Sequence, residues 1–282
     1  MRYYAPQNCD DALSALASGP FKILAGGTDY YPALRDRPAS EDTLDLTRIA
    51  ELRGITTTAD GWRIGATTTW TDIVRARLPA CFDGLQAAAR EVGSVQIQNA
   101  GTIAGNFCNA SPAADGVPPL LTLDAEVEIA SVNGRRLLPL SAFITGVRRT
   151  ALQPDEIVTA VLIPHQQAHS DFLKLGARKY LVISIAMVAA ALEIDDGGRI
   201  VKARVAVGAC SPVACRLAAL EADLVGATAA DLTAIVGPSH LAGLSPIDDV
   251  RADGGYRLQA VEELVRRVLV TAAAGPRREQ AA

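Results

Sequence analysis

Residues 23–30 read Ile-Leu-Ala-Gly-Gly-Thr-Asp-Tyr and form the first of two glycine-rich stretches in this sequence of 282 residues. The preceding run Phe21-Lys22-Ile23-Leu24 predicts a strand, and Pro32 suits the first turn of a helix. Adjacent glycines let the backbone approach a ligand closely and turn successive N–H groups toward an anion. The stretch therefore fits a diphosphate group, although a simple strand-to-helix turn capped by Thr28 or Asp29 explains it about equally well.

The second stretch is Thr-Ile-Ala-Gly-Asn at residues 102–106, followed by Asn-Ala-Ser-Pro-Ala-Ala-Asp-Gly at 109–116. Small residues, amides, hydroxyls and one carboxylate suit the hydroxyls and phosphates of a ligand, and a solvated surface loop is the alternative. Neither stretch has the G-x-G-x-x-G pattern, and the chain has no G-x-x-x-x-G-K-[ST]. Rossmann dinucleotide binding and P-loop phosphate transfer are therefore not indicated.

The composition favours a globular protein that binds small molecules or other proteins. The chain is 49% hydrophobic with a net charge of −4, which argues against a nucleic-acid groove or an anionic membrane face. The N-terminus shows no apolar signal region, and the longest apolar run, Leu181 to Leu192, is interrupted by Ser184 and is shorter than the ~20 residues of a membrane span. Five cysteines without CxxC spacing suggest a reducing cytoplasm.

Turn-forming residues divide the chain into three parts, residues 1–53, 54–165 and 166–282. The first part predicts a short helix capped by Asp10, with an apolar side formed by Ala12, Leu13 and Leu16.

The second part predicts strands at residues 62–65, 126–131 and 135–138 and helical stretches at 72–76 and 85–92. Asn133-Gly134 predicts a type I′ hairpin turn, in which both central residues have positive φ. Residues 93–119 show little periodicity, so we expect a long segment with little regular structure, which is usually functional in a compact domain.

The third part predicts an antiparallel hairpin of residues 185–194 and 200–207, with Lys202 and Arg204 on a solvent-exposed face. Helices are expected at residues 216–224 and 258–274. The second helix carries an apolar stripe formed by Val261, Leu264, Val265, Val268 and Leu269. Strands that precede helices indicate an α+β sandwich.

The order and spacing of three segments resemble the FAD-binding medium subunit of molybdenum hydroxylases, a family that includes xanthine dehydrogenase and carbon monoxide dehydrogenase type enzymes. These segments are residues 25–29, residues 102–115, and Lys-Leu-Gly-Ala-Arg-Lys at 174–179 before an Ile/Ala/Val strand. Tyr256-Arg257 before the last helix extends the resemblance along nearly the whole chain. It implies a vanillyl-alcohol-oxidase/MurB-like FAD-binding fold of two α/β subdomains, residues 1–53 and 54–165, and a C-terminal α+β domain, residues 166–282.

The resemblance also implies a set of FAD-binding residues, in which the two glycine-rich stretches share the diphosphate. Asp115 matches the acid that contacts the cofactor's polar chain, and Lys174 matches the basic residue near the isoalloxazine carbonyl edge. A cation there would stabilise negative charge on the reduced ring. Without the resemblance, an exposed strand lysine and a turn aspartate are the ordinary interpretations. The family commonly has glycine at the position of Ala104. The implied residues are Ile23, Leu24, Ala25, Gly26, Gly27, Thr28, Asp29, Tyr30, Val92, Thr102, Ile103, Ala104, Gly105, Asn106, Asp115, Val158, Lys174 and Ile183.

The function implied by the resemblance is electron transfer within a heteromeric complex. A molybdenum–pterin cofactor on a large partner and two [2Fe–2S] clusters on a small partner would feed FAD on this chain, in a dimer of heterotrimers. The terminal acceptor could be NAD, oxygen or a quinone, and the substrate a purine, another N-heterocycle, an aldehyde or carbon monoxide. His165 and His169 have metal-like spacing but no nearby acidic or cysteine ligand, so we assign no metal and no catalytic residue to this chain. A stand-alone flavin oxidoreductase and a scaffold that has lost its cofactor are the alternatives.

Overall fold

The structure, a computed structural model, describes residues 1–275. The chain forms two compact units. Unit 1 contains residues 1–76, 92–111 and 124–165, and unit 2 contains residues 77–91, residues 112–123 and the chain from Gln166 onward. Within residues 1–275, none of the helices combines the length and the apolar character that crossing a bilayer requires.

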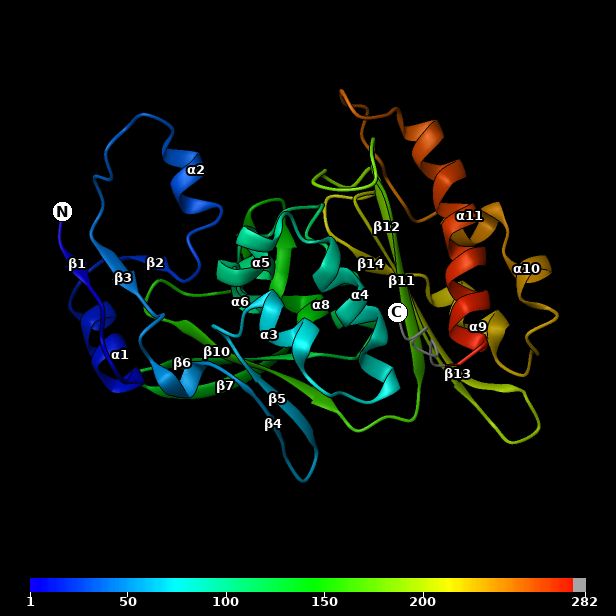
Figure 1. Ribbon diagram of the computed structural model, residues 1–282, viewed down its shortest axis with the longest axis horizontal. Coiled ribbons are helices and arrows are strands. Elements are labelled where there is room, and N and C mark those ends of the chain that lie inside the picture. Colours follow the sequence, from blue (N-terminus) through cyan, green and yellow to red (C-terminus); the bar gives the residue numbers. More distant parts are fainter. Residues whose placement is uncertain (276–282) are drawn as a thin grey trace. The chain divides into compact units, whose positions relative to one another are not determined.

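Unit 1 carries most of the strands, in three sheets (Figure 1). Its strands are β1 (Tyr3–Tyr4), β2 (Lys22–Leu24), β3 (Thr43–Asp45), β4 (Ile55–Thr57), β5 (Gly61–Gly65), β6 (Glu126–Ser131), β7 (Gly134–Pro139), β8 (Ile144–Gly146), β9 (Arg149–Thr150) and β10 (Ile157–Pro164). Its helices are α1 (Cys9–Ser18), α2 (Tyr30–Leu34), η1 (Ala50–Leu52), α3 (Trp70–Arg75), α5 (Val95–Ala100), α6 (Ile103–Cys108) and α8 (Leu140–Phe143).

The N-terminal sheet of unit 1 is parallel, in the order β1-β3-β2, and α1 packs into the core beside it. The apolar side expected for α1 is confirmed, because Ala12, Leu13 and Leu16 are all buried. The expected cap Asp10 is wrong. Helix α1 begins at Cys9, and the Asn8 side chain accepts a hydrogen bond from the backbone N–H of Asp11, so Asp10 lies in the first turn, where its charge still suits the helix dipole.

The second sheet of unit 1 is antiparallel, in the order β4-β5-β10-β6-β7. The hairpin of β6 and β7 is confirmed, but its type I′ turn is wrong. Ser131 pairs with Gly134, so Val132 and Asn133 are the central residues of the turn. Of Asn133 and Gly134, only Gly134 has positive φ, at 130°. A glycine at the fourth position is typical of a type I turn.

The expectation of little regular structure over residues 93–119 is also wrong. Three helices of six residues each, α5, α6 and α7 (Val117–Thr122), occupy most of this segment. The side chains of Ser94 and Thr102 cap α5 and α6 by accepting backbone hydrogen bonds. Helices of fewer than two turns show no periodicity in sequence, and their stability comes from caps and packing.

Unit 2 is built on one antiparallel sheet, in the order β11-β12-β13-β14. Its strands are β11 (His169–Leu175), β12 (Ala186–Ile194), β13 (Ile200–Gly208) and β14 (Cys215–Arg216). Its helices are η2 (Ala80–Phe82), α4 (Asp83–Glu91), α7 (Val117–Thr122), α9 (Ala218–Leu224), α10 (Leu232–Ile235), η3 (Pro238–Leu241) and α11 (Gly254–Ala273). The predicted hairpin of residues 185–194 and 200–207 is confirmed as β12 and β13.

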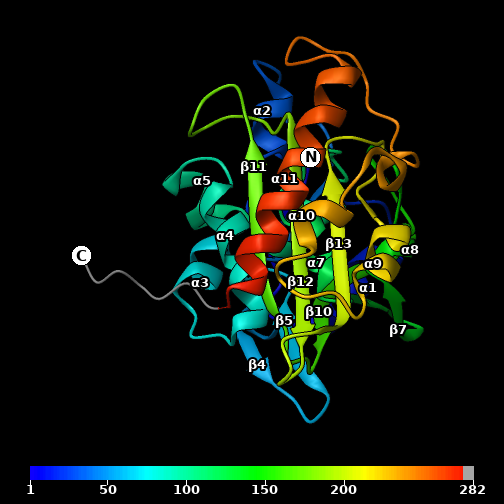
Figure 2. The ribbon, with the colours of Figure 1, turned by 90° about the vertical axis from the view of Figure 1, so that its right-hand side faces the viewer.

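Helices cover both faces of the unit 2 sheet, with α11 on one side and α4 on the other (Figure 1). Viewed toward α11, the helix crosses in front of the long strands (Figure 2). The expected solvent-exposed face of β13 is confirmed at Lys202, which is exposed, and is wrong at Arg204. Arg204 is only 2% exposed and donates through Nη2 to Glu193 Oε1 at 2.8 Å, and Ala206 on the same face is fully buried. The alternation of cations and apolar residues along a strand does not show whether a neighbouring strand brings a carboxylate within reach of one of the cations, as β12 does with Glu193.

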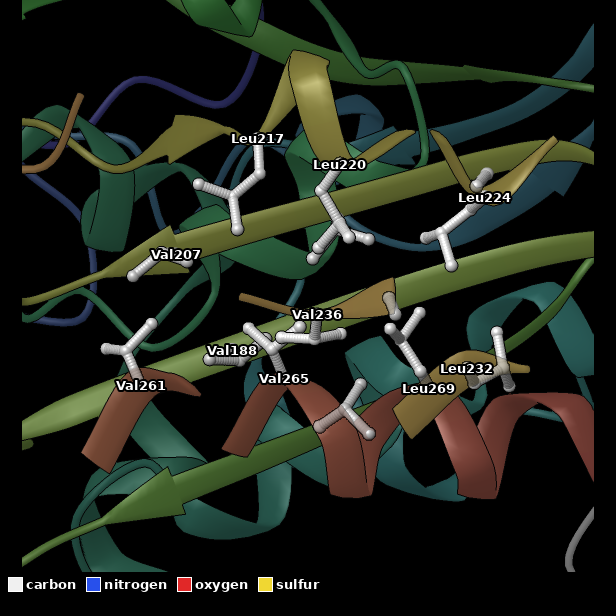
Figure 3. Close-up of a cluster of buried hydrophobic side chains, with 14 of the residues drawn as sticks. Val188, Val207, Leu217, Leu220, Leu224, Leu232, Val236, Val261, Val265 and Leu269 are labelled. Carbon is white, nitrogen blue, oxygen red and sulfur yellow. The ribbon is translucent and has the colours of Figure 1, made fainter. Parts of the chain in front are cut away.

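The main core of unit 2 lies between the sheet and helices α9, α10 and α11. The predicted apolar stripe is confirmed, since Val261, Val265, Val268 and Leu269 are fully buried and Leu264 is partly buried against the same cluster. Figure 3 shows side chains of α11 directed toward Val188 on β12, with Leu220 and Leu224 supplied by α9 and Leu217 by the residue just before that helix. The α+β class expected from the sequence is confirmed by this packing of helices on an antiparallel sheet.

Candidate functional site

One cavity of about 570 Å³ lies in unit 1 and is lined by both glycine-rich stretches. The segment from Lys22 to Tyr30 forms one wall, and Gly101, Thr102, Ala104, Gly105 and Asn106 form another. A volume of this size and a lining of few polar groups on a mainly apolar surface are typical of small-molecule sites. The two stretches, separated by some seventy residues, thus border the same space.

The first stretch presents backbone donors that have no acceptor elsewhere in residues 1–275. The N–H groups of Gly26, Gly27 and Thr28 make no hydrogen bond to the described chain. Further along, the Tyr31 N–H bonds to the Gly27 carbonyl at 3.1 Å. The side chain of Asp29, the residue just before α2, makes no capping bond. Consecutive unpaired N–H groups at a cavity wall form a site for an anion. The simple capped turn that the sequence also allowed therefore has no cap here.

The two adjacent glycines of this stretch are required for different reasons. A Cβ at Gly26 would lie 1.9 Å from the Ala100 carbonyl oxygen, so Gly26 permits the first stretch to touch the chain just before the second. Gly27 has φ of +68°, a left-handed conformation that favours glycine, and a Cβ there would meet the Tyr31 ring. Both glycines shape the wall of the cavity through contacts within unit 1.

The second stretch is fixed by the segment that precedes α3. Three backbone hydrogen bonds join them: Trp70 N–H to the Gly101 carbonyl at 3.1 Å, Ile103 N–H to the Thr68 carbonyl at 2.9 Å, and Ala104 N–H to the Ala66 carbonyl at 3.2 Å. Gly105 N–H donates to Thr102 Oγ1 at 3.1 Å. The N–H groups of Ile103, Ala104 and Gly105 are therefore used within the protein. The second stretch supplies a wall, while the first supplies the unpaired backbone donors.

Two further polar groups of the cavity wall stand out. The Tyr30 hydroxyl is buried and has no hydrogen-bond partner in residues 1–275, which is costly unless a ligand or water satisfies it. Arg148 contributes a guanidinium group, which donates through Nη1 to the Asn109 carbonyl at 3.0 Å.

Cys108 also lines the cavity. Burial raises the pKa of its thiol to about 12, so this cysteine is a neutral wall residue at physiological pH.

A second polar cluster lies in unit 2 and is buried. Lys174 on β11 donates through Nζ to Asp115 Oδ2 at 2.7 Å and to the Glu91 carbonyl at 3.3 Å. Ser184 donates its hydroxyl to Asp115 Oδ1 at 2.5 Å. The side chains of Lys174 and Asp115 are 5% and 9% exposed, so the exposed strand lysine that the sequence allowed is wrong. Two of the three ammonium hydrogens have acceptors in this cluster, and both carboxylate oxygens have donors.

Burial raises the pKa of the Asp115 carboxyl, and the charge of Lys174 together with the Lys174 and Ser184 hydrogen bonds opposes that rise. Burial is the larger influence on this pKa, because a carboxylate loses hydration in a protein interior. The ion pair and the Ser184 hydroxyl are therefore what make a charged Asp115 tolerable at this depth.

Most of the residues assigned to the cofactor from the sequence line the unit 1 cavity. Ile103 does not, because it is fully buried and packs inside unit 1. Asp115, Lys174 and Ile183 belong to unit 2, where Ile183 is 61% exposed. The assigned residues that line the cavity are Ile23, Leu24, Ala25, Gly26, Gly27, Thr28, Asp29, Tyr30, Val92, Thr102, Ala104, Gly105, Asn106 and Val158.

Sequence reasoning missed Ser184 and Arg148. Ser184 was visible as the one hydroxyl that interrupts the apolar run from Leu181 to Leu192, and a polar residue at such a position usually has a buried partner. Arg148 gave no signal, because its role follows from a turn between the short strands β8 and β9. Of the aromatic residues, Trp70 lines the cavity, whereas Tyr180 is exposed and lies under the Lys179 ammonium.

Comparison with known protein families matches nearly all of the chain. Residues 1–166 match the FAD binding domain in molybdopterin dehydrogenase, and residues 171–272 match the CO dehydrogenase flavoprotein C-terminal domain.

Individual relatives agree in sequence and in fold. The chain is 34% identical over 285 residues to the putative xanthine dehydrogenase FAD-binding subunit of Escherichia coli (strain K12), covering 96% of each chain. It is similar to a chain of carbon monoxide dehydrogenase from Hydrogenophaga pseudoflava, with a TM-score of 0.88, 29% identity and 97% of each chain covered. It is also similar to a chain of quinoline 2-oxidoreductase from Pseudomonas putida 86, with a TM-score of 0.89, 28% identity and 97% of each chain covered.

Proposed function

We propose a function from one premise: this chain belongs to the family of FAD-binding subunits of molybdenum hydroxylases. The proposed function is to carry electrons between a partner subunit and a terminal acceptor. The observation that supports the proposal most directly is the unit 1 cavity, whose wall offers three unpaired backbone N–H groups next to the second glycine-rich stretch. A diphosphate ligand would satisfy donors that the protein leaves open.

The groups present in unit 1 fit FAD on the chemistry of their donors. The backbone donors of Gly26, Gly27 and Thr28 suit phosphate oxygens, and the buried Tyr30 hydroxyl needs a polar partner. Apolar residues such as Val92, Ile97 and Val158 line the same cavity and suit a flavin or adenine ring. These residues would hold the cofactor, whose ring when bound supplies the capacity to take up electrons singly and release them as a pair.

Lys174 and Asp115 are proposed to act on the flavin through charge. Lys174 keeps one ammonium hydrogen without an acceptor in its cluster, and a cation beside the ring's carbonyl edge would favour negative charge there. Asp115, oriented by Ser184, fixes the direction of the ammonium group. The division of the chain into FAD-binding subdomains 1–53 and 54–165 and a third domain 166–282 is part of the same proposal.

The partners that we propose follow from the family. A small subunit with two [2Fe–2S] clusters and a large subunit with the molybdenum–pterin cofactor would complete the complex, as a dimer of heterotrimers in the cytoplasm. All five cysteines are free thiols, and proteins of a reducing compartment rarely contain disulfides. Within residues 1–275, no group of three or more His, Cys, Asp and Glu side chains could hold a metal ion.

The visible spectrum of the full chain purified from its native host tests the proposal. We expect flavin absorbance, and we expect the chain to co-purify with subunits that contain iron and molybdenum. A colourless chain that takes up no added FAD would favour a scaffold that has lost its cofactor. A flavin-containing chain that turns over a substrate without iron or molybdenum subunits would favour a stand-alone oxidoreductase.

A further inference from the structure

Arg148 occupies a turn that is fastened to the wall of the unit 1 cavity. The turn joins β8 and β9, and Arg148 makes two bonds to consecutive carbonyls of the segment after α6. Its backbone N–H donates to the Ala110 carbonyl at 2.8 Å, and its Nη1 donates to the Asn109 carbonyl at 3.0 Å. Arg148 and Asn109 both line the cavity.

The backbone at this contact is strained on both sides. Arg148 has φ of 58° and Ala110 has φ of 47°, so two residues that are not glycine adopt the left-handed conformation where they meet. Such a conformation costs about 1–3 kcal/mol per residue in sparsely populated regions, and it is found preferentially at ligand clamps and active sites. The two bonds to Asn109 and Ala110 offset this cost, and the one from Nη1 holds the guanidinium at the cavity wall although the side chain is exposed.

The side chains that line the cavity include more cations than carboxylates, and one of the cations has unused hydrogen-bond donors. The lining contains two side chains that are positively charged at physiological pH, Lys22 and Arg148, and one carboxylate, Asp29. In residues 1–275, the Nε and Nη2 groups of Arg148 have no hydrogen-bond partner, because Nη1 makes its only side-chain bond. Nε and Nη2 form one edge of the planar group and can donate together to two oxygens of a phosphate.

We propose that Arg148 binds the diphosphate of the dinucleotide cofactor through its Nε and Nη2 edge. Arg148 would supply a positive charge to the diphosphate, whereas the first glycine-rich stretch supplies neutral backbone donors. The inference rests on the proposed function, since it assigns a charged partner to the same ligand. Anchoring Nη1 to Asn109 lowers the entropy lost when the remaining edge binds. Arg148 thus compensates the charge that three backbone N–H groups leave unneutralised.

The test compares FAD binding by four forms of the full chain: wild type, Arg148→Gln, Arg148→Lys and the control Arg149→Gln. Arg149 is the next residue of the same hairpin, is exposed and does not line the cavity. Flavin is removed from each purified protein, and the dissociation constant for FAD is measured by flavin fluorescence at low and at high salt. Thermal unfolding of each flavin-free protein reports whether the hairpin remains folded.

We expect Arg148→Gln to raise the dissociation constant about ten- to a hundredfold at low salt, as the loss of a charge-assisted bond predicts. Added salt should weaken FAD binding less in Arg148→Gln than in wild type, because one ion contact is missing. Arg148→Lys should recover part of the affinity and all of the salt dependence, since the charge remains without the two-donor edge. Arg149→Gln should match wild type within about twofold.

Unchanged affinity in Arg148→Gln, equal losses in Arg148→Gln and Arg149→Gln, or a loss whose salt dependence equals that of wild type would each overturn the inference. The last result would leave Arg148 as a clamp on Asn109 and Ala110 alone. If Arg148→Gln does not fold, Arg148→Lys decides the matter through its affinity at low salt: a dissociation constant for FAD above that of wild type supports the inference, and an unchanged one overturns it. A wild-type chain that binds no FAD is a separate outcome, because it refutes the proposed function.

Discussion

Single residues of the cavity wall carry constraints that a motif alone does not reveal. The sequence identified Gly26 and Gly27 as a pair that lets a ligand approach, yet Gly26 makes room for the Ala100 carbonyl and Gly27 supplies a left-handed turn over Tyr31. A ligand-binding role of the loop therefore depends on how it packs against residues 100–101. This contact joins positions far apart in sequence, which is why the motif could not show it.

Gly26→Ala tests this packing. The new methyl group would overlap the Ala100 carbonyl, so the loop must move, and we expect a loss of about 1–3 kcal/mol in the free energy of unfolding together with reduced FAD content. Urea unfolding and the flavin-to-protein absorbance ratio measure the two effects. Gly19→Ala is the matched control, because Gly19 has extended φ of 163° and no atom within 4 Å of its Cβ position. Wild-type stability and flavin content in Gly26→Ala would refute the contact.

Lys174→Met tests the buried ion pair. Removing the ammonium leaves the Asp115 carboxylate without its cation, and breaking a buried pair in this way costs about 3–5 kcal/mol at neutral pH. Lys174 lowers the pKa of Asp115, so the variant raises that pKa further above its unfolded value. A carboxyl whose folded pKa is raised favours the folded state at low pH and loses that contribution as pH rises. The deficit of Lys174→Met should therefore shrink on acidification.

Denaturant unfolding of Lys174→Met across the acid-to-neutral range measures this dependence. The double variant Lys174→Met with Asp115→Asn is the control, since it has no carboxyl at position 115 and should show a deficit that does not change with pH. A deficit of Lys174→Met that is equally independent of pH would mean that Asp115 is not the group responsible.

Among the elements, length determined what the sequence could predict. Helix α11 spans 20 residues, and its apolar stripe was evident because five turns repeat the pattern. Helices α5, α6 and α7 span six residues each and had no repeat to detect. The sequence predicted strand β13 but did not predict that Arg204 is buried. An arginine in a strand is expected to face solvent, and the sequence does not show that Glu193 lies beside it.

Leu269→Ala tests the contribution of α11 to the core of unit 2. Leu269 is fully buried in the cluster between α11 and the sheet, so truncation should leave a cavity and lower the free energy of unfolding by about 2–5 kcal/mol. Val270→Ala, one position along the same helix, removes a side chain that is 47% exposed and should change stability by less than about 0.5 kcal/mol. Similar losses from both variants in chemical denaturation would contradict the packing in Figure 3.

For the whole molecule, the family could be inferred from the sequence because three segments keep their order and spacing over nearly the entire chain. The same order gave no indication that α4 and α7, which lie early in the sequence, cover a face of the sheet formed by β11 to β13. Pairing of distant segments depends on side-chain packing that no local pattern records. The matched families divide at about residue 166, whereas the two compact units interleave along the chain.

Expression of residues 166–282 alone tests this interleaving. The fragment keeps the sheet and α11 but lacks α4 and α7, so Phe172, Met187 and Ala189 lose the residues that bury them, Ala88 among them. We expect the fragment to bind the dye ANS and to associate in size-exclusion chromatography, whereas the full chain does neither. A peptide of residues 77–91 should reduce dye binding, and a scrambled peptide of the same composition should not. A monomeric fragment that unfolds cooperatively without binding dye would show that α4 is dispensable.

The early position of α4 also has a consequence during biosynthesis. The helix ends at Glu91 and its sheet begins at His169, so about 80 residues must leave the ribosome before α4 can meet β11, which takes several seconds at typical elongation rates. Over that interval Leu85, Ala88 and Ala89 of α4, which are buried in the finished structure, have no sheet to cover them. We therefore expect the speed of translation through codons 92 to 169 to affect how much of the chain folds correctly as it is made.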